Sequence, residues 1–470
     1  MNSFIAKTRV LLINPSRTIG IYKKAKVIVP EAPNLTLATI AAPLLKAGHT
    51  VDILDLAIKT EPEKHLRQKI KDFRPDFVGI TFATPTFHEA ASISKIIKEI
   101  NPKITLIGGG PHASVLPEES LRESEFDTVV IGEGDNILFE VSHGKALKDV
   151  PGLAYKTNGS IQRSGPRNYV EDLDNLEFPS WQLYDLKKYR SSRSLTRKRS
   201  IGFIETSRGC PYGCIYCNKG IFGNRVRVKS PKRVISEMKY LLSLGFEEIH
   251  PQDDAFTVDL NRAKEICRLI IAEKLKFPWV LGNGVRIDAV DEEFLRLAFR
   301  SGCYKVQYGI ESASQDILKG IDKRLDLGKV EKVVNLSHSI GLEVATFFIF
   351  GLPGETEKSM KDGIDLAVKL DTLYSKASIL IPFPGTPVWK DWEPKGYIKS
   401  RDWSIYSFHN DMFELYDHPD IEMRLIYRYY QLFYRKFYLR ISYIIKRLKH
   451  AVAFRHLFSD MCYFINQFWS

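Results

Sequence analysis

Three cysteines stand close together in the segment RGCPYGCIYC, namely Cys210, Cys214 and Cys217. A structural zinc site needs four closed nitrogen or sulfur ligands. No fourth Cys or His is adjacent, since the closest histidines are His143 and His250. Three thiolates on a [4Fe-4S] cubane instead leave one iron open to a further ligand. The spacing favours a catalytic iron–sulfur cluster, with zinc as the alternative if a distant residue supplies a fourth ligand.

The remaining cysteines, Cys267, Cys303 and Cys462, are scattered among apolar residues, which is typical of small buried side chains. A disulfide framework is disfavoured because the cluster is odd in number. The apolar run at 10–13 is too short for a signal peptide, and no window of 18 apolar residues exists. We therefore expect a cytoplasmic protein whose thiols stay reduced.

Strand–helix alternation over residues 201–390 places the cysteines. Strands are expected at 202–207, 247–253, 279–284, 305–311, 344–351 and 378–383, with helices near 231–244, 259–274, 291–300, 326–340 and 356–370. Six such units predict a partial (β/α)6 barrel, and its site belongs at the carboxyl ends of the strands. The cysteine segment follows the first strand, so it falls at the mouth of this barrel.

Residues 1–140 alternate in the same way. Short apolar strands at 10–14, 51–56, 76–82, 104–110 and 127–132, separated by helices, predict a parallel, doubly wound sheet of flavodoxin-like type. Ligands bind such sheets beyond the carboxyl ends of the strands, where Thr81, Gly108, Gly109, Gly132 and Glu133 fall. Residues 141–200 are rich in Gly, Pro and Asn and are predicted to be a linker.

Residues 391–470 are predicted to form a helical, basic and aromatic C-terminal region. Apolar residues recur every three or four positions on one helical face: Leu425, Tyr429, Phe433, Phe437, Ile441, Ile444 and Leu448. This face either packs on the barrel as a wall of the substrate pocket, which we favour, or lies on an anionic membrane. The pattern does not resemble a base-stacking surface, so no nucleic-acid partner is expected.

Composition narrows the class of protein without naming a ligand. The 470 residues are 44% hydrophobic and 26% charged, which excludes a disordered or fibrous chain. The 68 basic and 56 acidic residues give a net charge of +12. An excess of this size suits an anionic ligand or surface, or is simply spread over solvated side chains.

With an aromatic residue before its last cysteine, the C-x3-C-x2-C segment resembles the signature of the radical S-adenosylmethionine superfamily. The resemblance covers about residues 196–400. It implies a partial (β/α)6 barrel, a [4Fe-4S] cluster on the three cysteines, and S-adenosylmethionine bound at the open iron. Reductive cleavage of that ligand to a 5′-deoxyadenosyl radical is the activity implied, with a flavodoxin or ferredoxin as electron donor.

The resemblance also assigns residues around S-adenosylmethionine. Tyr216 matches the aromatic position beside the adenine, and Asp253 with Asp254 matches the segment that meets the methionine amino group, although the usual glycines are absent. Glu311 and Ser312 match positions near the ribose and carboxylate, and Gly351 matches the glycine motif near the adenine. Asp253 and Asp254 as helix N-caps are the alternative. Arg286 either binds the carboxylate or pairs with a neighbouring acid.

The pairing of the N-terminal domain with this barrel resembles the cobalamin-binding class, the anaerobic Mg-protoporphyrin monomethyl ester cyclase-like and methyltransferase-like group. The GGGPHAS and GEGD segments match its loops around the corrin. The chain lacks the D-x-H-x-x-G motif of many cobalamin domains, and His112 is the nearest imidazole, expected to be a hydrogen-bonded bystander. A flavodoxin-like domain without cofactor is the alternative.

These patterns predict a radical S-adenosylmethionine enzyme that, with cobalamin, methylates an unactivated carbon of a small, hydrophobic substrate. Radical cyclisation or rearrangement of a hydrophobic or tetrapyrrole-like substrate is the alternative. A metal-stabilised, non-catalytic protein that binds RNA or a membrane is the alternative of another class. Peripheral contact with a membrane through the C-terminal helix is the alternative to docking on the barrel.

Overall fold

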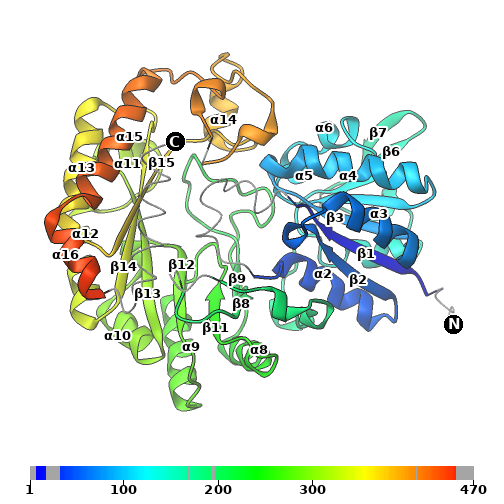
Figure 1. Ribbon diagram of the computed structural model, residues 1–470, viewed down its shortest axis with the longest axis horizontal. Helices are drawn as coiled ribbons and strands as arrows, with labels where there is room; N and C mark the ends of the chain where they lie inside the picture. The colour runs from blue at the N-terminus through cyan, green and yellow to red at the C-terminus, as the bar shows by residue number, and fades with distance from the viewer. Residues whose placement is uncertain (1–6, 17–31, 167–168, 192–195, 409, 451–470) are drawn as a thin grey trace.

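The computed structural model describes residues 7–16, 32–166, 169–191, 196–408 and 410–450. Two α/β units lie side by side, with the N-terminal unit at the right of Figure 1 and the larger unit at the left. The C-terminal helices pack on the outer edge of the larger unit. The α/β fold class predicted from the sequence is confirmed. Cys462 and the last part of the predicted C-terminal region lie outside the described residues.

The N-terminal sheet has seven strands in the order β2-β1-β3-β4-β5-β6-β7. The first five are parallel and are covered by helices on both faces, which explains why five of the six residues of β1 are buried. The strands are β1 (Arg9–Asn14), β2 (Thr50–Asp55), β3 (Phe77–Thr81), β4 (Thr105–Gly109), β5 (Thr128–Val130), β6 (Leu153–Thr157) and β7 (Ser160–Arg163). The helices are α2 (Leu35–Lys46), α3 (Pro62–Phe73), α4 (Phe87–Ile100), α5 (Pro111–Val115), α6 (Pro117–Arg122) and α7 (Ile137–Ser142).

This sheet extends beyond the boundary expected at residue 140. β6 and β7 lie within the predicted linker, and they join the sheet antiparallel to β5 and to each other. Asn158 and Gly159 connect them with positive φ angles of 46° and 78°. An Asn-Gly pair favours such a two-residue hairpin turn. The Gly and Asn content of this segment therefore reflects a hairpin as well as loops.

The second sheet has six parallel strands in the order β15-β14-β13-β12-β11-β8. Its strands are β8 (Ile201–Ile204), β11 (Glu248–Pro251), β12 (Trp279–Val285), β13 (Cys303–Glu311), β14 (Glu343–Phe350) and β15 (Tyr374–Ile379). The helices are α8 (Pro231–Ser243), α9 (Leu260–Ala272), α10 (Glu292–Arg300), α11 (Gln315–Gly320), α12 (Leu327–Ile340) and α13 (Glu357–Leu370). β8 and β15 are the two edges, so the sheet is a partial barrel.

The sixth strand begins four residues before the predicted position, at Tyr374 instead of 378. The apolar run Ile379–Ile381 suggested a later strand, whereas the observed strand carries Lys376 in its middle. Lys376 is exposed while its neighbours Ser375 and Ala377 are buried. The lysine faces the barrel interior, because alternate residues of a strand face opposite sides. Because the charged Lys376 faces inward, the hydrophobic pattern did not indicate a strand at these residues.

The C-terminal region packs against the edge strand β15 through α15 (Met423–Tyr438), which is followed by α16 (Ile441–His450) and preceded by the short α14 (Pro387–Trp392). Three tyrosine hydroxyls bond the free backbone groups of this strand. Tyr434 accepts from the Ala377 N–H and donates to its carbonyl, at 3.2 and 2.9 Å. Tyr438 does the same at Ser375, at 3.1 and 2.8 Å, and Tyr443 donates to the carbonyl of Leu373 at 2.9 Å. We call this set the tyrosine edge cap.

The helical face expected at the C-terminus is found in part. Tyr429, Phe433 and Phe437 are buried, together with Met423 and Ile426. Ile441 and Ile444 are instead 77% and 46% exposed, because the helix is interrupted between α15 and α16 and the periodicity does not run through. The buried face packs on α13 and β15, so the docking interpretation holds and membrane contact is not supported. No described helix is long and apolar enough to span a bilayer.

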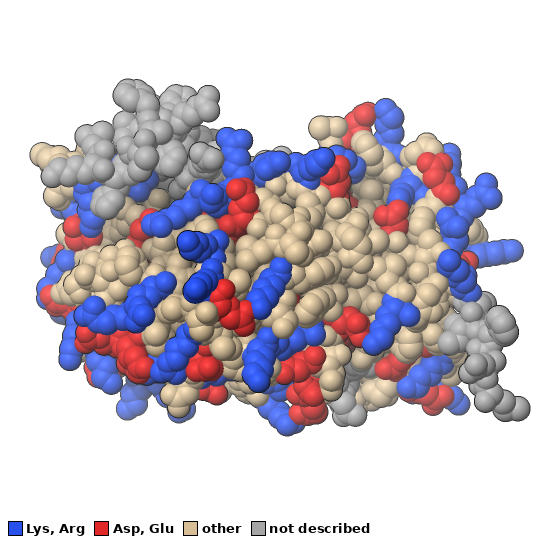
Figure 2. Space-filling model, turned by 90° about the horizontal axis from the view of Figure 1, so that it is seen from below, with Lys and Arg blue, Asp and Glu red and all other residues tan. Residues whose placement is uncertain are grey.

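The positive charge is dispersed on the face of the molecule seen in Figure 2. Lys and Arg side chains alternate there with Asp and Glu around a tan band of uncharged residues. A continuous basic stripe, the electrostatic footprint of nucleic-acid binding, is not seen on this face.

Candidate cofactor and substrate site

The cysteine segment forms the loop that joins two short antiparallel strands, β9 (Ser207–Arg208) and β10 (Arg227–Val228). Two glycines shape it. Gly209 has a φ of +85°, and a Cβ atom there would lie 2.3 Å from the Arg225 carbonyl oxygen. A Cβ atom on Gly213 would lie 1.6 Å from an Asp322 carboxylate oxygen. Only glycine fits at 209, where backbone closes the space, whereas a larger residue at 213 would displace the Asp322 side chain.

Cys210 and Cys217 line a cavity of about 780 Å³ at the mouth of the barrel, and Cys214 lies between them on the same loop. Among the described residues no three His, Cys, Asp or Glu side chains are close enough to share one metal ion. A cubane does not require that, because each cysteine binds a different iron. Cys267 and Cys303 are buried in the core, as predicted, and far from such a role. The donor set and the adjoining space fit a cluster with one open iron.

Asp253 and Asp254 follow β11 and take different positions. Asp253 is 3% exposed and accepts hydrogen bonds from the Thr206 N–H, the Thr206 hydroxyl and the Ser207 hydroxyl, so it fixes the start of the cysteine loop. Asp254 is exposed to the cavity and, among the described residues, accepts a hydrogen bond only from the Gly209 N–H, at 3.2 Å. Neither caps the following helix, because the N-cap of α9 is Asp259.

Glu311 ends β13 in a conformation that non-glycine residues rarely adopt, with a φ of +68°. The register with β14 shifts at this point, and the carboxylate turns into the cavity, where it pairs with Lys323 at 2.9 Å. A Cβ atom on Gly309 would lie 2.5 Å from the Glu311 carboxylate, so Gly309 makes room for the pair. Backbone strain of this kind is concentrated at functional sites.

The other residues expected around S-adenosylmethionine divide into two groups. Tyr216 lines the cavity, and burial raises the pKa of its hydroxyl well above the usual range. Ser312 and Gly351 do not line it. The Ser312 hydroxyl accepts from the Ser314 N–H, and Gly351 packs against Ile426 of α15, where a Cβ would approach to 3.2 Å. The structure thus does not bring these two residues to the cavity.

Arg286 pairs with a neighbouring acid, which is the second of the two roles that the sequence left open. Its guanidinium pairs with both oxygens of Asp288, donates to the carbonyls of Lys323 and Arg324, and lies 3.9 Å from the centre of the Tyr212 ring. Because these contacts occupy its donors, Arg286 supports the wall of the cavity.

A second cavity of about 490 Å³ lies between the two units. It opens at the carboxyl ends of the N-terminal strands, and all five residues expected at the corrin line it: Thr81, Gly108, Gly109, Gly132 and Glu133. Gly132 faces the other unit, since a Cβ there would lie 3.6 Å from the Ile221 carbonyl. Gly108 is also packed within the N-terminal unit, where a Cβ atom would lie 3.1 Å from the side chains of Phe82 and Phe126. The cradle suits a flat ligand that approaches the backbone.

His112 lies outside this cavity and is fully buried. Its ring stacks on Phe87 with centroids 4.6 Å apart, and its Nδ1 is 3.3 Å from the Thr84 hydroxyl. Burial, with a smaller contribution from His88, lowers the pKa of His112 to about 3. The expected bystander role agrees with these contacts. Within the described residues no histidine lines the second cavity.

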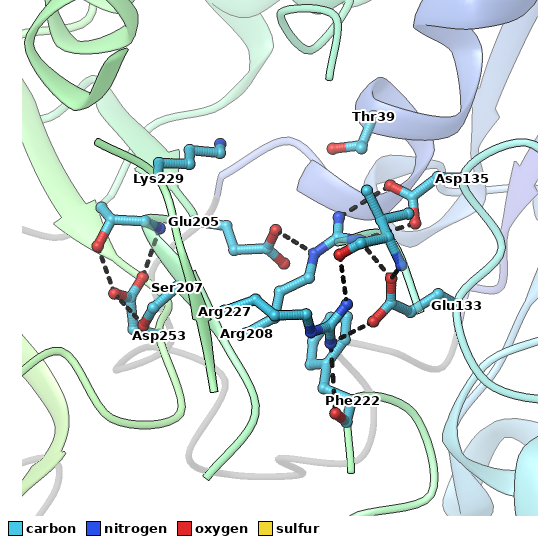
Figure 3. Close-up of polar contacts among 12 residues, drawn as sticks. Thr39, Glu133, Asp135, Glu205, Ser207, Arg208, Phe222, Arg227, Lys229 and Asp253 are labelled. Carbon is cyan, nitrogen blue, oxygen red and sulfur yellow. Dashed lines mark hydrogen bonds and ion pairs between the residues drawn. The ribbon is translucent and has the colours of Figure 1, made fainter. Parts of the chain in front are cut away.

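A charged network joins the units beside this cavity (Figure 3). Arg208, two residues before the first cysteine, donates to Glu133 at 3.0 Å, to both oxygens of Asp135 at 2.8 Å and to Glu205 at 2.6 Å. Arg227 pairs with the other oxygen of Glu133. Burial alone would lower the pKa of Arg208, but Glu205, Asp135 and Glu133 outweigh it and raise the pKa well above its usual value.

Of this network, only Glu133 was predicted from the sequence; its partners Arg208 and Arg227 were not, nor were Asp135 and Glu205, which pair with Arg208. The only local signal was the position of Arg208 beside the cysteine segment and of Asp135 within GEGD. Nothing in the sequence indicates that these two loops meet, because they are 73 residues apart.

Comparison with protein families gives two matches on separate parts of the chain, a B12-binding domain at residues 25–142 and the radical SAM superfamily at residues 204–367. An uncharacterized methyltransferase of Pyrococcus horikoshii is 32% identical over 445 residues, covering 93% of this chain and 94% of that protein. The anaerobic magnesium-protoporphyrin IX monomethyl ester cyclase of Rubrivivax gelatinosus is 26% identical over 448 residues, 92% of this chain and 78% of that protein.

Two solved structures share the fold. The radical S-adenosylmethionine methyltransferase TsrM of Kitasatospora setae, solved with cobalamin and a [4Fe-4S] cluster, matches with a TM-score of 0.69 and 22% identity over 84% of this chain and 76% of that one. The cobalamin-dependent S-adenosylmethionine radical enzyme OxsB, solved with aqua-cobalamin and S-adenosylmethionine, matches with a TM-score of 0.73 and 17% identity over 98% of this chain and 70% of that one. Because the Pyrococcus match runs through both units and the two family models match one unit each, the chain belongs to the radical S-adenosylmethionine superfamily, in the class with a B12-binding domain.

Proposed function

We propose that this enzyme transfers a methyl group to an unactivated carbon of a small molecule. The observation that carries the proposal is that the two cavities lie back to back. Glu205 and Arg208 line the second cavity, whereas Cys210, on the same loop, lines the first. After β11, Gln252 faces the second cavity and Asp253 the first. Both loops therefore border the two cavities at once, which is the arrangement that a relay of a methyl group between them needs.

When bound, the cluster and S-adenosylmethionine supply a carbon-centred radical, and cobalamin supplies a methyl carrier. The protein supplies binding and orientation. Cys210, Cys214 and Cys217 would hold three irons. Asp254 and Glu311 would offer carboxylates to the amino and ribose groups of S-adenosylmethionine, and Tyr216 would offer an aromatic face to its adenine. Asp253 acts through Thr206 and Ser207, by fixing the strand end that leads into the cysteine loop.

On the other side, the backbone at Gly108, Gly109 and Gly132, with Thr81 and Glu133, would form the corrin cradle. Since no histidine lines this cavity within the described residues, we do not assign a protein imidazole to cobalt. The apolar walls of the first cavity favour a hydrophobic substrate. A small electron donor such as flavodoxin or ferredoxin completes the reaction, and the reduced thiols and cluster suit the cytoplasm.

Radical cyclisation is the second candidate, favoured by the similarity to the Rubrivivax cyclase over 92% of this chain. The two reactions differ in the fate of the methyl group. Methylation delivers it to the product, whereas cyclisation leaves the product without an added carbon.

The test uses anaerobically purified and reconstituted enzyme. Analysis for iron, sulfide and cobalt comes first, followed by incubation with methyl-labelled S-adenosylmethionine and a reductant. We expect cluster iron, bound cobalt and labelled methylcobalamin, with S-adenosylhomocysteine and 5′-deoxyadenosine as coproducts. Iron without cobalt would remove the methyl-carrier role and favour cyclisation. Zinc in place of iron, with neither coproduct, would remove the enzymatic function and favour a binding protein.

A further inference from the structure

We propose that Lys376 binds an anionic group of the substrate, so that the molecule to be methylated carries a carboxylate, phosphate or phosphonate on an otherwise apolar body. The inference rests on the proposed function, because it assigns one end of the substrate in the first cavity.

Lys376 is placed inside the barrel. It sits in the middle of β15, its side chain is exposed, and it lines the cavity that also contains Cys210 and Cys217. Although the side chain is exposed, burial of its amine beside this cavity lowers the pKa of Lys376. An ammonium group in such a place has lost much of its hydration, and a bound anion restores what it has lost.

The other cations that line this cavity are already neutralised. Lys323 pairs with Glu311 at 2.9 Å, and Arg286 is held by Asp288. Lys376 has no hydrogen bond or ion pair within the described residues, and no acid contributes to its pKa. Lys305, deeper in the barrel, is close enough for Lys376 to act on its pKa. Glu343 and Glu248 act on Lys305 more strongly than Lys376 does, whereas the amine of Lys376 itself has no acidic counter-charge among the described residues.

The rest of the wall defines the body of the ligand. Phe347 lies beside Lys376 on the neighbouring strand, and Ile349, Ile379, Phe383 and Tyr430 add apolar surface. Ser378 also lines the cavity, two residues further along the same face of β15, and offers a hydroxyl next to the amine. One cation without a partner, next to a hydroxyl and apolar side chains, is the pattern by which binding sites orient an amphipathic ligand.

The position of the lysine also fixes an orientation. β15 and β8 are opposite edges of the sheet, and the cysteine loop follows β8. An anionic group held at Lys376 therefore anchors the substrate on a different strand from the one that leads to the cysteine loop. The apolar part of the substrate then extends toward the cofactors, where the reacting carbon has to lie.

The test compares two fluorescent probes with the same ring system, 1-anilinonaphthalene-8-sulfonate, which is anionic, and N-phenyl-1-naphthylamine, which lacks the sulfonate. Binding is measured on reconstituted enzyme with S-adenosylmethionine present. For Lys376→Met we expect the sulfonate probe to bind about tenfold more weakly or worse, with the neutral probe changed less than about twofold. Lys376→Arg keeps the charge and should retain most of the preference. Lys361→Met removes an exposed lysine from α13 and is the matched control.

Displacement of the sulfonate probe by benzoate or by phenylphosphonate then distinguishes a carboxylate from a phospho group. Displacement by either one supports the proposal. Equal weakening of both probes in Lys376→Met, or no weakening of the sulfonate probe, overturns it. Unchanged iron content and circular dichroism confirm that the variant is folded.

The two proposals fail separately, because probe binding needs no turnover. Enzyme that binds the sulfonate probe through Lys376 but transfers no methyl group sinks the methylation proposal and keeps the anion site. Enzyme that forms labelled methylcobalamin while Lys376→Met leaves both probes unaffected sinks the anion site and keeps methylation.

Discussion

At the scale of single residues, the adjacent acids Asp253 and Asp254 illustrate how one motif serves two purposes. Asp253 is buried and its oxygens are fully engaged by Thr206 and Ser207. Asp254 faces the cavity with one backbone contact. The sequence treats them alike, whereas the structure gives the first a positioning role and leaves the second available to a ligand.

This difference predicts that replacing each acid by Asn affects a different property, stability for Asp253 and ligand binding for Asp254. Asp253→Asn places an amide among three donors, so we expect the free energy of unfolding to fall by about 1–3 kcal/mol. Asp254→Asn should change the free energy of unfolding by less than about 0.5 kcal/mol, because its side chain is exposed, and should weaken S-adenosylmethionine binding instead. Urea unfolding and equilibrium dialysis measure the two effects. A stable Asp253→Asn with weakened ligand binding would reverse our assignment.

At the scale of elements, the turn after β14 depends on one buried acid. Glu355 accepts hydrogen bonds from the N–H groups of Gly351 and Leu352, at 2.6 and 3.2 Å. Gly351, assigned from the sequence to the adenine, thus takes part in a turn that packs on α15. Burial raises the pKa of Glu355 from 4.5 to about 8.

The raised pKa predicts a pH dependence. The folded protein holds the Glu355 proton more tightly than the unfolded chain does, so this group lowers stability as pH rises from 4.5 to about 8. The expected slope approaches about 1.4 kcal/mol per pH unit within that range. Glu355→Gln removes this slope, whereas Asp365→Asn, at an exposed position of α13, leaves it unchanged. Parallel curves for wild type and Glu355→Gln would contradict the assignment.

The tyrosine edge cap predicts that single hydroxyl groups matter. Tyr438→Phe leaves the N–H and carbonyl of Ser375 without a partner, and we expect a loss of about 1–3 kcal/mol in the free energy of unfolding. Tyr397→Phe is the control, because its hydroxyl makes no hydrogen bond among the described residues. Chemical denaturation measures both. Equal stability of the two variants would mean that water replaces the hydroxyl at no cost.

These elements show how much of the fold could be predicted from the sequence. Apolar strands such as β1, β3 and β14 were predicted closely, because both faces are buried and the hydrophobic run is continuous. β15 was displaced because Lys376 faces a cavity, and β6 and β7 were missed because a short hairpin reads as a loop. The cysteine loop followed from spacing. The Arg208 network did not, because pairing between loops distant in the chain leaves no local pattern.

At the scale of the whole molecule, the two units are joined by buried charges. Glu133 bridges Arg208 and Arg227, and the side chains of all three are no more than 3% exposed. Arg208 adjoins the cysteine loop and pairs with Glu133, which lies in the loop expected at the corrin. The network therefore sets the relative position of the two cavities. It acts as a rigid joint beside the proposed path of the methyl group.

We expect Glu133→Gln to lower the free energy of unfolding by about 3–5 kcal/mol, because it leaves two buried guanidinium groups undercompensated. Glu63→Gln removes an exposed partner of Arg67 and should cost less than about 1 kcal/mol. Thermal unfolding of both variants at low and high salt checks the prediction, since a buried pair is screened little. A loss confined to low salt would show that the network is exposed in solution.

The tyrosine edge cap has a consequence for biosynthesis. A ribosome releases the chain from its N-terminus, so β15 emerges some sixty residues before Tyr434 and Tyr438, at positions 374–379 against 434 and 438. Throughout that interval the nascent barrel carries an unprotected edge strand, the element most prone to pair with another chain. The nascent chain is therefore most exposed to wrong strand pairing over this window.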